Sequence, residues 1–159
     1  MSMTPEQMEE RTRDSMLKGF HCSQAVMAAG LEKCGVEDES LLRAMAPMGG
    51  GVAASGGPCG ALTGGVAMLG RLFGKPAPEA RDDKRMWTAT AEFYRRFETE
   101  IAAPYGSVNC RDIAKVDWKN KEQVKDFYAG AGARECACST GKAARILGEV
   151  IEKYAEGGG

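Results

Sequence analysis

The segment CACSTGKAARILGEVIEKY, residues 136–154, decides the fold class of this chain. Its small and apolar residues are separated by steps of 4, 3, 4, 3 and 4 and are Cys136, Thr140, Ala143, Leu147, Val150 and Tyr154. This spacing predicts an amphipathic α-helix, because residues three and four positions apart share one helical face. We therefore expect a long C-terminal helix whose apolar face packs against other helices.

The remaining periodic segments also repeat at helical spacing. Thr4-Pro5-Glu6-Gln7 combines a hydroxyl N-cap, a proline at the first helical position and a glutamine three residues after the cap. That cap predicts a helix up to about Lys18. The same reasoning predicts helices over 22–34, 39–46, 79–101 and 121–129 and a short helical turn starting near Cys110. It also predicts a helix that opens at Cys59 and has the apolar residues Leu62, Val66, Leu69 and Phe73 at helical spacing.

No segment shows the alternation of apolar and polar residues that a strand requires. The expected fold is therefore all-α. We expect one compact helical domain over residues 1–159, with five or more helices and a flexible tail at 157–159.

The glycine-rich segment 48–65, MGGGVAASGGPCGALTGG, contains eight glycines and runs into the apolar residues of the 62–73 helix. We interpret it as a tight loop before a buried central helix. Gly60 and Gly64 lie four residues apart, so both fall on one helical face. The absence of side chains there lets another backbone or a cofactor approach closely.

The charge balance argues against polyanionic partners. The chain has 21 Lys and Arg against 22 Asp and Glu, a net charge of −1, which excludes the basic excess typical of proteins that bind nucleic acids or anionic membranes. No apolar stretch approaches the roughly 20 residues that span a bilayer. The N-terminal residues lack the apolar region of a secretory signal, so we expect a cytoplasmic protein. Disulfides are rare in that compartment, and its clustered cysteines more often bind metals or carry out redox chemistry.

The six cysteines are dispersed along the chain, at positions 22, 34, 59, 110, 136 and 138. There is no C-x-x-C pair, so a thioredoxin-type dithiol and a zinc ribbon both lack their local signature. A site built from these thiols must draw them from several helices. Cys59 and Cys110 each come at the start of an expected helix, where free N–H groups and the helix dipole favour a thiolate. On the last helix Cys136 faces inward, whereas Cys138 is rotated away by about 200°.

These residues resemble the redox-active protein family named for its C, GCAxxG, C, C pattern. The resemblance rests on GPCGALTG at 57–64, CSQAV at 22–26, Asn109-Cys110-Arg111 and the Cys136 helix. The same module is similar to the small domain of split-Soret cytochrome c, which implies an iron–sulfur centre in an all-helical fold. The resemblance implies that Cys22, Cys59, Cys110 and Cys136 are the ligands, with Gly60, Ala61 and Gly64 completing the central motif.

Two departures from the family pattern leave alternatives open. The central residues read C-G-A-x-x-G, so they do not match the letter order GCAxxG of the family name. The sequence C-A-C at 136–138 makes Cys138 an alternative ligand to Cys136. Cys34 matches nothing in the pattern, and we expect it to be structural. His21, the only histidine, is a weaker candidate ligand. The expected metal ligands are thus Cys22, Cys59, Cys110, Cys136 and Cys138, and the expected cofactor-binding glycines are Gly57, Gly60 and Gly64.

Three functions are compatible with this set. The leading hypothesis is electron transfer or redox sensing through a bound iron–sulfur cluster, of [2Fe–2S] rather than [4Fe–4S] type, with a redox partner protein. The second is a thiol–disulfide protein without metal, and the third is a structural zinc site. We expect a redox protein rather than a conventional enzyme, and the aromatic and methionine content is compatible with a homodimer.

Overall fold

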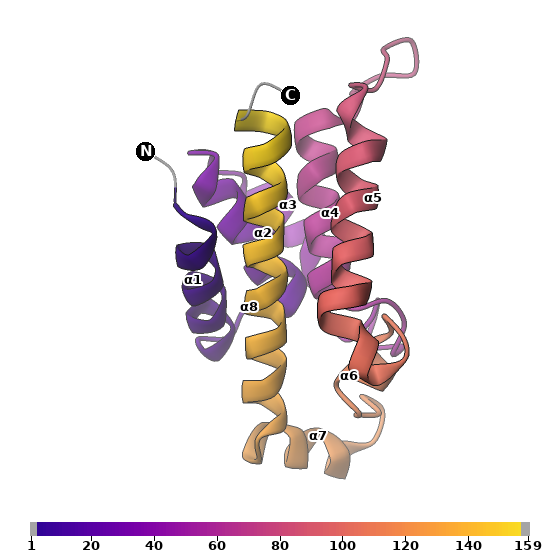
Figure 1. Ribbon diagram of the computed structural model, residues 1–159. Coiled ribbons are helices and arrows are strands. Elements are labelled where there is room, and N and C mark those ends of the chain that lie inside the picture. The colour runs from indigo at the N-terminus through magenta and orange to yellow at the C-terminus, as the bar shows by residue number, and fades with distance from the viewer. Residues whose placement is uncertain (1–2, 157–159) are drawn as a thin grey trace.

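The computed structural model describes residues 3–156, so the tail expected at 157–159 lies outside the described residues. Within 3–156 the chain forms eight α-helices and no strand (Figure 1). The helices are α1 (Pro5–Leu17), α2 (Cys22–Lys33), α3 (Glu39–Met45), α4 (Gly60–Phe73), α5 (Arg85–Phe97), α6 (Cys110–Ile113), α7 (Lys121–Ala129) and α8 (Gly132–Ile151). The expectation of an all-α fold is confirmed.

Helix α8 lies at the centre of the arrangement and contacts α1, α2, α4, α5 and α7. Figure 1 shows α1 on one side of α8, α4 and α5 on the other, and the short helices α6 and α7 together at one end of the molecule. The amphipathic pattern that predicted α8 explains this position. Thr140, Ala143, Leu147 and Val150 are buried, as the spacing requires.

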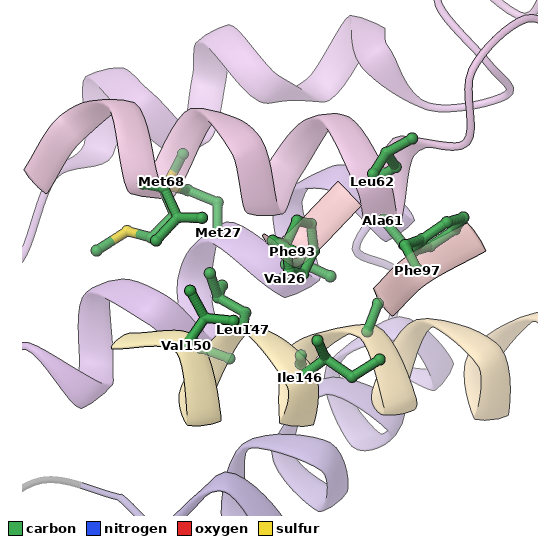
Figure 2. Close-up of a cluster of buried hydrophobic side chains, with 14 of the residues drawn as sticks. Val26, Met27, Ala61, Leu62, Met68, Phe93, Phe97, Ile146, Leu147 and Val150 are labelled. Atoms are coloured by element: carbon green, nitrogen blue, oxygen red, sulfur yellow. The ribbon is translucent and has the colours of Figure 1, made fainter. Parts of the chain in front are cut away.

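The core lies between α2, α4, α5 and α8 (Figure 2). Met68 and Leu69 of α4, Phe93 of α5 and Leu147 of α8 are completely buried in it. Burying side chains of this size contributes on the order of 2 kcal/mol each to folding. The core therefore fixes the relative positions of α2, α4 and α8, whose N-terminal ends form part of the candidate site.

Helices α2 and α4 approach each other closely through glycines. A Cβ atom at Gly64 would lie 2.7 Å from the Ser23 carbonyl oxygen, and one at Gly30 would lie 2.6 Å from Cγ of Met68. Only a residue without a side chain fits at such distances. At Gly64 the backbone that approaches closely, as the sequence predicted, is that of Ser23 in α2, whereas Gly60 faces the sulfur of Cys22 and the Met48 carbonyl oxygen.

Most expected helix boundaries agree with the structure within a few residues, but the helix expected over 79–101 begins only at Arg85. The preceding residues form a loop held by polar contacts. Asp83 donates its backbone N–H to the Phe73 carbonyl, and its carboxylate accepts the N–H of Arg85. Beyond Phe97 the chain continues in a π-helical turn over Glu98–Ala102. The charged residues of the loop fit a helical pattern, but these local hydrogen bonds prevent helix formation there.

Candidate functional site: a cavity lined by four cysteines

Four of the six cysteines line one cavity of about 390 Å³. They are Cys22, Cys59, Cys110 and Cys136. Cys59 and Cys110 are buried, whereas Cys22 and Cys136 are partly exposed. No two of these four belong to the same helix, so the cavity gathers thiols from positions as far apart as 114 residues in the chain.

Each of the four thiols lies near the start of its helix. Cys22 is the first residue of α2, Cys59 is the N-cap of α4, Cys110 is the first residue of α6, and Cys136 lies in the second turn of α8. The N-terminal ends of the longer helices α2, α4 and α8 thus meet at the cavity. Their free N–H groups and helix dipoles favour negative charge there.

A short antiparallel bridge between Pro58 and Asn109 aligns two of the cysteines. Cys59 donates its backbone N–H to the Val108 carbonyl at 2.9 Å, and Cys110 donates its own to the Gly57 carbonyl at 2.7 Å. These bonds join the segments before α4 and before α6. The bridge therefore fixes Cys59 and Cys110 beside each other, although they are far apart in sequence.

The glycine-rich segment forms a left-handed turn next to the cavity. Gly50 and Gly51 have positive φ, and so do Val52, Ala53 and Ala54, with φ of 67°, 53° and 57°. Left-handed backbone costs a residue with a side chain roughly 1–2 kcal/mol. Strain of this kind persists where the surroundings impose it, and it clusters at functional sites. The turn also brings the Gly50 N–H to the sulfur of Cys22.

Cys22 and Cys59 share a hydrogen bond, and their acidities diverge because of it. The Cys59 thiol, supported by the backbone N–H groups of Ser23, Gly50 and Gly60, lowers the pKa of Cys22 from 9.0 to about 7, although burial acts in the opposite direction. The same hydrogen bond, followed by burial, raises the pKa of Cys59 well above its ordinary value. Cys22 is therefore the thiolate of the pair near neutral pH.

The other two cavity cysteines are less acidic than free cysteine. Burial raises the pKa of Cys110, even though the indole N–H of Trp118 donates to its sulfur at 3.3 Å. Burial raises the pKa of Cys136 to about 12. The sequence expectation that Cys59 and Cys110 carry the acidic thiols is therefore wrong. The hydrogen bond with Cys22, followed by burial, outweighs the benefit of a helix start for the pKa of Cys59. Burial does so for the pKa of Cys110, and the donors gather on Cys22 instead.

Of the three other candidates from the sequence, His21 lines the cavity, whereas Cys138 and Cys34 do not. His21 lines the cavity, and so does Gly50 of the left-handed turn. Helix α8 includes both Cys136 and Cys138, and Cys138 is exposed and is not among the cavity-lining residues. Cys34 caps the end of α2 and packs against the core, away from the cavity lining.

The three predicted glycines surround the cysteines without lining the cavity themselves. A Cβ atom at Gly60 would lie 2.5 Å from Sγ of Cys22, and one at Gly57 would lie 2.9 Å from the Gly51 carbonyl oxygen. Gly64 lies further along α4, against the backbone of Ser23. Their role in the structure is to admit neighbouring chain segments. Contact with a cofactor stays a prediction.

Sequence reasoning missed the aromatic residues of the cavity. Trp118 packs edge-on against Phe127, with ring centroids 5.1 Å apart, and Phe127 packs in the same way against Tyr128. All three line the cavity, together with Phe20. Trp118 belongs to the irregular segment between α6 and α7, where no periodicity indicates which way a side chain points.

The comparison with protein families concerns the same four cysteines. A family model described as "Putative redox-active protein (C_GCAxxG_C_C)" matches residues 20–150. This chain belongs to that family. The matched range contains all four cavity cysteines, and the assignment suggested by GPCGALTG at 57–64 is confirmed. The similarity to split-Soret cytochrome c stays a prediction.

No significant match was found among curated proteins or among solved structures. Across residues 3–156, no helix combines the length and the apolar character that crossing a membrane requires. In the same described range, no three His, Cys, Asp or Glu side chains lie close enough together to hold a metal ion between them as they stand. The four thiols line a cavity and do not converge on a single point.

Proposed function

We propose that Cys22, Cys59, Cys110 and Cys136 hold an iron–sulfur cluster, of [2Fe–2S] rather than [4Fe–4S] type, and that the protein transfers electrons or senses redox state. The observation that carries this proposal is the cavity of about 390 Å³ lined by four thiols from four helices. Four cysteine thiolates are the usual ligand set of both cluster types. When bound, such a cluster would supply a centre that accepts and returns one electron.

The chemistry of the cavity fits this group. Backbone N–H groups of Gly50 and Gly60 and the indole N–H of Trp118 already point at cysteine sulfurs. Hydrogen bonds to ligating sulfurs stabilise their negative charge and raise the reduction potential of a cluster. The N-termini of α2, α4 and α8 add further positive potential.

The size of the cavity favours a cluster over a single zinc ion. Zinc binds thiolates at about 2.3 Å, so four sulfurs around one ion must lie nearly in contact with one another. Among residues 3–156 no three potential ligands lie close enough to hold one ion as they stand, and the four thiols border a cavity of about 390 Å³. A group with more than one metal atom fills this space better.

The deciding experiment is iron and acid-labile sulfide analysis, with an absorption spectrum, on anaerobically purified protein. We expect two irons and two sulfides per chain. Serine variants of the four cavity cysteines should each lose most of the iron, whereas Cys34→Ser and Cys138→Ser serve as matched controls and should retain it. Stoichiometric zinc without sulfide would instead identify a structural zinc site. Retention of iron in Cys136→Ser with loss in Cys138→Ser would contradict the ligand assignment.

One observation favours a second function. The hydrogen bond between Cys22 and Cys59 places a thiolate against a thiol, which is the arrangement from which a disulfide forms. In that case both thiols release their protons and give two electrons to an oxidised acceptor, and a sulfur–sulfur bond forms. Metal-free protein that loses two titratable thiols on mild oxidation, at Cys22 and Cys59 by peptide mapping, would support this alternative.

A further inference from the structure

A second hollow of about 490 Å³ adjoins the cysteine cavity. Trp118 lines both hollows. The second one, called here the Trp118 groove, is bordered by Ser55, Gly56, Arg111, Lys115, Asp117 and Lys119. One side chain thus separates an open groove from the cavity that contains the four thiols.

The Trp118 groove is cationic. Arg111, Lys115 and Lys119 are exposed, and Asp117 is the only carboxylate among the lining residues. Three cations and one carboxylate leave an excess of two positive charges, in a chain whose net charge is −1. Within residues 3–156 none of these three cations forms an ion pair. Their charge is therefore available to a molecule from outside.

The backbone holds these groups in place. Arg111 donates its Nε–H to the Gly56 carbonyl oxygen at 3.0 Å, which directs the guanidinium along the groove wall. Lys115 has a left-handed backbone, with φ of 54°, and its amine lies 5.9 Å from the centre of the Tyr105 ring. A non-glycine residue in this conformation marks a position that the surrounding structure imposes.

The groove also offers a short route to a cluster ligand. The Trp118 indole nitrogen lies 3.3 Å from Sγ of Cys110. Electron transfer slows steeply with distance, so the place where a partner comes within one side chain of a ligating sulfur is a favourable point of exchange. At the Trp118 groove that place coincides with a local excess of positive charge.

We propose that the Trp118 groove is the docking site of an acidic redox partner protein, which exchanges single electrons with the centre in the cysteine cavity past Trp118. This inference rests on the proposed function. In each exchange the reduced partner loses one electron and the oxidised centre gains it, or the reverse, and no covalent bond forms or breaks. Charge complementarity identifies the partner, because a cationic groove attracts an acidic surface and repels a basic one.

Cytochrome c supplies a probe whose charge can be inverted. The native protein is basic, and the fully succinylated protein is acidic with the same haem. We expect the anaerobically reduced holoprotein to reduce succinylated cytochrome c at a rate that falls as ionic strength rises. The double variant Lys115→Gln, Lys119→Gln should slow this reaction about tenfold at low salt. The matched control Lys75→Gln, Lys84→Gln neutralises two exposed lysines of the loop between α4 and α5 and should leave the rate unchanged.

A second readout does not depend on electron transfer. In a Trp87→Phe background Trp118 is the sole tryptophan, so its fluorescence reports on the groove. Iodide should quench it less in the lysine double variant than in the parent, and caesium should quench it more. Equal quenching by both ions in parent and variant would show that the groove is not cationic at Trp118.

The iron content of every variant separates the two proposals. Iron bound as expected, with a rate that the groove lysines do not affect, overturns the docking site and leaves the proposed function intact. The same result follows if native and succinylated cytochrome c react alike. Protein that binds no iron refutes the proposed function and, with it, the exchange of electrons at the groove. Binding of a DNA duplex that the double variant abolishes, with no effect on cytochrome c reduction, would also overturn the acidic-protein assignment.

Discussion

The α-carbon of Gly60 lies so close to Cys22 that a Cβ atom at position 60 would stand 2.5 Å from its sulfur. The same atom would also lie 3.1 Å from the Met48 carbonyl oxygen. An added methyl group must displace the Cys22 thiol or push α4 away from α2 and from the Met48 carbonyl. We predict that Gly60→Ala lowers the iron content of the protein by more than half and its free energy of unfolding by about 1–3 kcal/mol. Iron analysis and denaturant titration measure the two effects.

Gly70 supplies the matched control on the same helix. A Cβ atom there would meet nothing within 4 Å, so Gly70→Ala adds only helix propensity. This variant should keep its iron and become more stable by up to about 1 kcal/mol. If Gly60→Ala behaves in the same way, the close approach of α4 to Cys22 does not constrain the site.

The acidity of Cys22 predicts how the metal-free protein reacts with iodoacetamide. Its pKa of about 7 lies below the ordinary 9.0, so the thiolate forms as the pH rises through 7. Alkylation of Cys22 should reach half its maximal rate near pH 7. Cys136, whose pKa burial raises to about 12, should stay nearly unreactive over the same range. Peptide mapping by mass spectrometry separates the two sites.

Removing the donor tests the cause of that acidity. Cys59→Ala deletes the thiol that hydrogen-bonds to Cys22, so the alkylation midpoint of Cys22 should move to higher pH. Because a lowered acid pKa stabilises the folded state above the unfolded pKa, the parent should also gain stability relative to this variant as the pH rises from 7 to 9. A midpoint that stays near 7 would assign the effect to the backbone N–H groups alone.

The hydrogen bond from Trp118 to Cys110 predicts an effect on redox potential. Trp118→Phe keeps the aromatic packing on Phe127 and removes the indole N–H. If Cys110 ligates the proposed cluster, its sulfur then carries more uncompensated negative charge, which disfavours the reduced centre. The reduction potential of the holoprotein should therefore fall while its iron content stays the same. Spectroscopic redox titration measures the shift, and an unchanged or higher potential would contradict this role.

Periodicity predicted those parts of the site that lie within regular helices. The 3.6-residue repeat placed Cys136 inward and Cys138 outward, and α8 includes both residues with Cys138 exposed. It could not place Trp118, because the segment between α6 and α7 follows no repeat and its side chains are oriented by tertiary contacts. The same limit explains the late start of α5, where hydrogen bonds of Asp83 compete with the helix.

Thiol acidity was the feature that the sequence predicted least well. A position at a helix start marks both Cys59 and Cys22 as recipients of free N–H groups, and it cannot show which sulfur receives more donors. The left-handed turn at 50–54 decides this by directing the Gly50 N–H to Cys22. That turn includes Val52, Ala53 and Ala54, which sequence rules would not assign to left-handed backbone. Its conformation follows from packing, which a local pattern does not contain.

Thr12 carries a buried hydroxyl, and we expect it to lower the stability of the fold. The residue is fully buried in α1, the helix that packs most extensively on α8, and among residues 3–156 its Oγ1 has no hydrogen-bond partner. An unsatisfied buried hydroxyl costs about 1–3 kcal/mol. Thr12→Val keeps the shape and the β-branch, so it should raise the free energy of unfolding by about 1 kcal/mol and the Tm by about 2–5 °C.

The variant Thr12→Ser provides the opposite change at the same position. It retains the hydroxyl and removes the methyl group, so it should lower the free energy of unfolding by about 1 kcal/mol through the lost apolar contact. Calorimetry of the three proteins, all with the same iron content, compares the two effects directly. Lower stability in Thr12→Val than in the parent would mean that the hydroxyl has a partner in solution, such as a buried water molecule between α1 and α8.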